Sequence, residues 1–177
     1  MVFALLLLCA CSSSDRSSTG ATVPGSTSTT DPYAVPATID IPYLNRVFLA
    51  LEKINGDATR LIVANRRITP EAANLLHSIL TDDAFHDATE VWNEQIDGGL
   101  AGFRADPGDR KIAVTKVLAV RVDCVAVEVS NDYNAVRREP IAPSAGKISL
   151  ASRPRAAPNP TSWVIAKDLK SGNLPCA

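Results

Sequence analysis

The chain has 177 residues and a formal net charge of −1, from 18 basic and 19 acidic residues. This length allows a single domain of about 140 residues behind a low-complexity start, and excludes a second domain of ordinary size. Charges of both signs are mixed along the sequence, so no basic surface is expected and nucleic acid is excluded as an expected partner.

The apolar run from Val2 to Ala10 is too short to cross a bilayer as a helix, which takes about 20 residues. We interpret residues 1–10 as a signal peptide. The run ends in Leu8-Cys9-Ala10-Cys11, which resembles the lipobox of bacterial lipoproteins. The resemblance implies that Cys11 becomes the mature N-terminus and carries diacylglycerol and an acyl chain such as palmitate.

The same resemblance implies a lipid anchor in the cell membrane and a protein on its extracytoplasmic face. No basic residue opens the segment, so we expect the true translation start to lie upstream of Met1. Two alternatives are an ordinary secretory signal that is cut elsewhere and a buried N-terminal strand. Ser, Thr, Gly and Pro dominate the sequence that follows, so residues 11–39 are predicted to be a flexible stalk and residues 40–177 the globular domain.

Two cysteines remain once Cys9 is removed with the signal peptide and Cys11 is lipidated. They are Cys124 and Cys176, and the implied compartment is oxidising. We predict that they form a disulfide that ties the C-terminal tail to a strand, with a contribution of about 4 kcal/mol in the chain-entropy model. The alternative is two separate buried thiols.

Helical spacing of apolar residues predicts four helices in the first half of the domain. The first follows the N-cap Asp40 and ends at Gly56, and a weaker second helix covers residues 58–65. Thr69-Pro70-Glu71 predicts the start of a third helix, which runs through Leu80. Asp82 or Asp83 is expected to cap the fourth helix, which stops at Gly98-Gly99.

After Gly108 the pattern changes to alternation and β-branched residues, which predicts strands. Val125, Val127 and Val129 should share one face. The expected strands cover residues 112–120, 121–132, 147–153 and 162–168. Helices followed by strands predict an α+β domain in which N-terminal helices pack on a curved antiparallel sheet of about four strands.

This order of elements resembles the cone-shaped nuclear-transport-factor-2-like fold over residues 40–168. The segments that carry the resemblance are Asp123-Cys124-Val125-Ala126-Val127-Glu128-Val129 and Asn159-Pro160-Thr161-Ser162-Trp163. The chain is also similar to uncharacterised cell-surface lipoproteins of GC-rich bacteria that share a lipobox, a polar stalk and a late cysteine pair. The alternative fold is a helical hairpin packed on an unrelated four-stranded meander.

No metal site or cofactor is predicted, because His77 and His86 belong to no metal-binding spacing. Pairing of His86 with Glu90 on a helix surface is the simpler interpretation. Four acidic residues at helical spacing are interpreted as a solvated face rather than as a cation site. They are Asp83, Asp87, Glu90 and Glu94.

Trp92, Tyr133 and Trp163 are the candidate lining of an apolar pocket, although aromatic residues serve a small core equally well. Asp132 and Tyr133 are neighbours and should point to opposite faces, so an acid and a hydrogen-bond donor do not converge there. Asp132 is interpreted as a turn residue. No GxSxG motif occurs, and no catalytic residue is predicted.

The sequence favours a non-catalytic, membrane-anchored binding or interaction module that contacts another envelope protein or a small apolar ligand. The alternative is an isomerase-like or hydrolase-like enzyme that uses the cavity of a cone-shaped fold. Several inward-facing acids, histidines or tyrosines around one cavity would indicate the enzyme. A cavity lined by aliphatic side chains and tryptophan would indicate the binding module.

Overall fold

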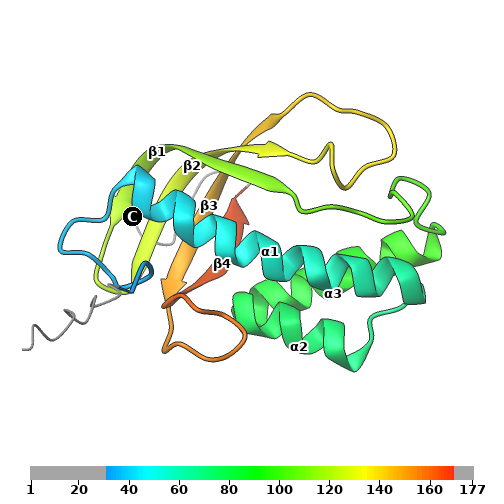
Figure 1. Cartoon of the computed structure of the whole chain (residues 1–177), viewed down its shortest axis with the longest axis horizontal. Helices are drawn as coiled ribbons and strands as arrows, with labels where there is room; N and C mark the ends of the chain where they lie inside the picture. The colour runs from blue at the N-terminus through cyan, green and yellow to red at the C-terminus, as the bar shows by residue number, and fades with distance from the viewer. Residues whose placement is uncertain (1–30, 170–177) are drawn as a thin grey trace, which may run out of the picture.

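The computed structural model describes residues 31–169, in which three helices precede a four-stranded antiparallel sheet (Figure 1). The predicted α+β class is therefore confirmed. In chain order the elements are α1 (Ile41–Asn65), α2 (Pro70–Ile79), α3 (Asp82–Asp97), β1 (Lys111–Val120), β2 (Cys124–Asp132), β3 (Ser144–Ser152) and β4 (Trp163–Leu169). Cys11 and Cys176 lie outside the described residues, so the lipid site and the disulfide stay predictions.

Side-chain oxygens cap all three helices at their N-termini. Asp40 accepts a hydrogen bond from the Tyr43 amide at 2.8 Å, and Thr69 accepts one from the Ala72 amide at 3.2 Å, as expected. The prediction for α3 was wrong, because Thr81 is the cap instead of Asp82 or Asp83. The two aspartates occupy the first turn, where their charges favour the positive end of the helix dipole.

The predicted break at Gly56 is also wrong, since α1 is one helix of 25 residues. Ala58 and Ile62 continue its buried face beyond the glycine, and each is fully buried. A single glycine in a helix costs only about 1 kcal/mol relative to alanine, which this burial outweighs. The helix ends at Asn65, where the predicted second helix was expected to end, and Arg66 follows in the left-handed conformation (φ 52°).

The sheet is a meander in the order β1-β2-β3-β4, and every neighbouring pair is antiparallel. Val125, Val127 and Val129 all face the core, as predicted. The edge strand β1 carries two register irregularities, which bend a strand and increase its twist. Asn45 of α1 accepts a hydrogen bond from the Val114 amide at 2.8 Å, so this helix also satisfies a backbone group of the edge strand.

The helices lie on one face of the sheet and enclose the core (Figure 1). Helix α1 packs on β1 and α2, whereas α3 packs on α2 and β4. Near the start of α1 the core holds Trp163, whose indole Nε1 donates to the Tyr43 hydroxyl at 2.9 Å. Both side chains are buried, so this pair joins β4 to α1.

The helices-first order agrees with the nuclear-transport-factor-2-like resemblance, and the sequential meander agrees with the alternative. The assignment to that fold therefore stays a prediction.

A single parallel bridge from Leu80 to Ile165 links the α2–α3 connection to β4. Within residues 31–169, none of the helices combines the length and the apolar character that crossing a membrane requires.

Candidate ligand-binding cavity

A cavity of about 710 Å³ lies among all three helices, the inner face of the sheet and the loops that flank β1 and β2. Its size is within the range of about 300 to 1,000 Å³ that is usual for small-molecule sites. Most of its wall is apolar, with α2 and α3 on one side and the sheet on the other. The apolar side chains include Leu76, Ile79, Leu80, Trp92, Phe103, Val136, Ile148 and Ile165.

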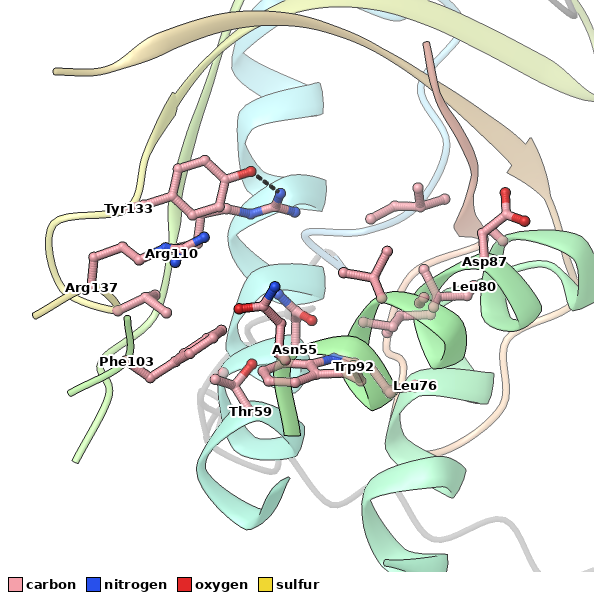
Figure 2. A pocket seen from close by; sticks show the side chains of 18 of the residues that line it. Asn55, Thr59, Leu76, Leu80, Asp87, Trp92, Phe103, Arg110, Tyr133 and Arg137 are labelled. Atoms are coloured by element: carbon pink, nitrogen blue, oxygen red, sulfur yellow. Dashed lines mark hydrogen bonds between the residues drawn. The ribbon is translucent and has the colours of Figure 1, made fainter. Parts of the chain in front are cut away.

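The cavity also has a polar end, where Arg110 contacts the other polar side chains (Figure 2). The Arg110 guanidinium donates two hydrogen bonds to Glu52, from Nη2 to Oε1 at 2.5 Å and from Nε to Oε2 at 2.8 Å. Its third nitrogen, Nη1, donates to the Tyr133 hydroxyl at 3.1 Å. The Asn55 amide donates to Glu52 Oε2 at 3.2 Å, which completes a four-residue network.

The ion pair in this network is largely buried, with side chains that are 16% exposed for Arg110 and 3% exposed for Glu52. As a whole residue, Glu52 is only 2% exposed in the middle of α1. Burial by itself lowers the pKa of Arg110, but the charge of Glu52 and the hydrogen bonds to it raise that pKa above its ordinary value, with a smaller contribution from Tyr133. An arginine is charged in proteins, and the bidentate geometry holds the Arg110 guanidinium plane in place.

The network presents one oriented donor to the cavity. The Tyr133 hydroxyl accepts from Arg110, so its own proton remains to be donated. Arg137 lies on the same wall, with its guanidinium carbon 5.1 Å from the centre of the Phe103 ring. No carboxylate among residues 31–166, whose side chains the structure describes, forms an ion pair with Arg137.

The segment before β1 is held against α1 at Gly56, which positions Arg110. A Cβ atom on Gly56 would lie 1.9 Å from Asp109 Oδ1, so the glycine lets the Asp109 side chain adopt this position, from which a larger residue would displace it. Asp109 then accepts a hydrogen bond from Arg60 at 2.9 Å, one turn further along α1. Hydrogen bonds to Asp57 and Asp109, in that order, raise the pKa of Arg60. The glycine that the sequence pattern suggested as a helix end serves instead as a contact point.

Two of the three candidate pocket residues line this cavity. Trp92 forms part of its floor and packs on Phe103, with 5.1 Å between the ring centres. Tyr133 contributes the hydroxyl described above. Trp163 is not among the lining residues, because its ring lies in the main core against Tyr43.

The remaining polar candidates lie apart from the polar end of the cavity. Asp132 accepts a hydrogen bond from the Asn134 amide at 2.9 Å and so shapes a turn, while its neighbour Tyr133 faces the cavity. His77 stacks on Phe85, and His86 forms an exposed pair with Glu90 at 3.2 Å. No group of three or more His, Cys, Asp or Glu side chains in the described part of the chain is arranged to hold a metal ion.

Sequence reasoning missed Glu52 and Arg110. A signal for Glu52 was present, because it lies four residues after Phe48 and therefore on the apolar face of its helix. A charged residue in such a position requires a buried partner. Nothing in the sequence identifies Arg110 as that partner, since it is 58 residues away.

Comparison with known proteins adds no functional assignment. No protein-family model matches the chain, and no curated protein matches it. A de novo designed β-sheet protein solved by NMR is similar over 72% of this chain and 89% of its own, with 17% sequence identity and a TM-score of 0.29. A likeness of this degree supports no conclusion about fold or function.

Proposed function

We propose that this protein is a lipoprotein anchored on the extracytoplasmic face of the membrane, and that its domain binds a small, largely apolar ligand without catalysis. The observation that carries the binding role is the 710 Å³ cavity, whose apolar walls end in the fixed network around Arg110. Apolar walls with a few convergent polar groups are typical of small-molecule sites. The lipobox at Cys11 and the polar stalk support the location.

The composition of the cavity wall favours binding over catalysis. Among the described residues that line it, Asp87 supplies the carboxylate and is exposed on α3, and none is a histidine. Glu52 is held behind Arg110 by two hydrogen bonds. An acid–base reaction needs an acid and a base within hydrogen-bond reach of the same substrate atoms, and this wall does not supply the pair.

The lipid anchor is tested by the Cys11→Ala variant. Removing the thiol removes the acyl chains, each of whose buried methylenes contributes about 0.8 kcal/mol to membrane binding, so the protein should move to the soluble fraction. Cell fractionation and the intact mass of the mature chain measure this change. Cys9→Ala is the matched control and should stay in the membrane. Equal membrane retention of both variants would contradict the anchor.

The binding role is tested by native mass spectrometry of protein that is released from membranes without denaturation. A small molecule should leave the native complex when the protein unfolds. Ala88→Trp places a large ring in the cavity and should abolish co-purification, whereas Leu49→Trp alters a position that is 73% exposed and should not. If the protein carries no small molecule, or if Ala88→Trp still carries it, the cavity is not the binding site.

A further inference from the structure

We propose that the ligand is an amphiphile with a single carboxylate, which is bound at the Tyr133 and Arg137 end of the cavity while its apolar body lies against α2, α3 and the sheet. This inference rests on the proposed binding function and defines its ligand class. It follows from how the charges around the cavity are paired.

Arg110 is not itself the anion site, although it is the most buried cation of the wall. Two of its nitrogens are occupied by Glu52, and the third donates to Tyr133. The Glu52–Arg110 pair is neutral as a unit, so it attracts no further charge. Its effect on a ligand is indirect, because it orients the Tyr133 hydroxyl so that the proton is available to an acceptor in the cavity.

Arg137 supplies the positive charge that the ligand would neutralise. Its guanidinium packs on the Phe103 ring and has no carboxylate partner within residues 31–166. A Cβ atom on Gly102 would lie 2.6 Å from Arg137 Nη1, so the glycine leaves the space that this side chain occupies. An anion at this end gains a charge-assisted hydrogen bond, about twice as strong as a neutral one.

The far end of the cavity disfavours a second carboxylate. Figure 2 shows Asp87 across the cavity from Arg137, beyond Leu76 and Leu80. A ligand long enough to span the apolar wall would bring a second negative group towards this carboxylate, where like charges repel. Along the cavity the cation Arg137 is therefore followed by the apolar wall and then by the anion Asp87. This order fits a ligand with one carboxylate on an apolar body.

The test is calorimetric titration with three probes that differ only in their polar groups: naphthoate, its neutral isostere naphthamide, and naphthalene dicarboxylate. The protein is the mature chain from position 11 with Cys11→Ala, so that no detergent competes for the cavity. Naphthoate should bind about tenfold more tightly than naphthamide, as expected for one charge-assisted hydrogen bond. The dicarboxylate should bind no more tightly than naphthamide.

Arg137→Gln should remove the preference for naphthoate, because it lowers the naphthoate affinity more than the naphthamide affinity. The matched control is Arg138→Gln, which removes the same charge from the next, exposed residue outside the cavity wall and should keep the preference. Equal binding of naphthoate and naphthamide, or equal losses in the two arginine variants, overturns the carboxylate assignment but leaves cavity binding intact. If no probe binds, the carboxylate assignment is overturned. The binding role of the cavity is then judged separately, by whether a small molecule co-purifies with the protein.

Discussion

The Arg110→Met variant is expected to lower the free energy of unfolding by about 3 to 5 kcal/mol, the usual cost of removing one partner of a buried ion pair. The substitution leaves the Glu52 carboxylate in the core, where it is 2% exposed. Its remaining donor is the Asn55 amide at 3.2 Å, which cannot replace two hydrogen bonds from a guanidinium. Urea unfolding at neutral pH, followed by circular dichroism, measures the change.

A second variant shows whether the loss comes from the unpaired charge. Arg110→Met combined with Glu52→Met replaces the pair with apolar side chains and should recover most of the stability, because such replacements are often neutral or stabilising. The exposed pair of His86 and Glu90 provides the surface control, and Glu90→Gln should cost less than about 1 kcal/mol. A loss in Arg110→Met as small as this control would show that the buried pair is absent in solution.

Asn159→Asp is expected to lower the free energy of unfolding by about 2 to 4 kcal/mol, because the Ser78 carbonyl loses its side-chain donor, the Trp163 carbonyl keeps only the Thr161 hydroxyl nearby, and a carboxylate is buried beside both oxygens. The Asn159 amide donates to the carbonyl oxygens of Ser78 at 3.0 Å and Trp163 at 2.9 Å. Its own oxygen accepts from the Thr161 amide and hydroxyl, both at 2.9 Å. Aspartate keeps the shape of the side chain but provides only acceptors, so the link between α2 and β4 is lost.

The same chemical change at Asn134 serves as the control for this prediction. Asn134 uses its oxygen to accept a hydrogen bond from the Ile141 amide at 2.8 Å, and this bond is exposed. Asn134→Asp retains that acceptor and should change stability by no more than about 0.5 kcal/mol. Similar urea midpoints for the two variants would contradict the role given to the Asn159 amide.

Local patterns predicted most of the secondary structure. Asp40 and Thr69 cap helices as expected, because a capping bond joins groups only three residues apart. The alternation from Val125 to Val129 identified a strand with one buried face, since strand periodicity is also local. Gly56 misled the prediction because its function depends on a residue far along the chain, Asp109.

The candidate site was predicted only in part, for the same reason. Trp92 and Tyr133 were selected by residue type, and the fold places both on the cavity wall. Trp163 has the same chemistry but lies in the core, because its neighbour in space is Tyr43 on α1. The sequence did not rank these aromatic residues, since each is equally able to line a pocket or fill a core.

The sequence alone determined that helices precede strands, the α+β class and the absence of a metal-binding spacing, all of which depend on residues close together in the chain. Only the tertiary structure decided where the cavity lies, that Glu52 meets Arg110, and that Arg137 has no acidic partner among residues 31–166. Charge pairing and cavity shape depend on contacts between residues that are tens of positions apart. These contacts exist only after the helices have packed on the sheet.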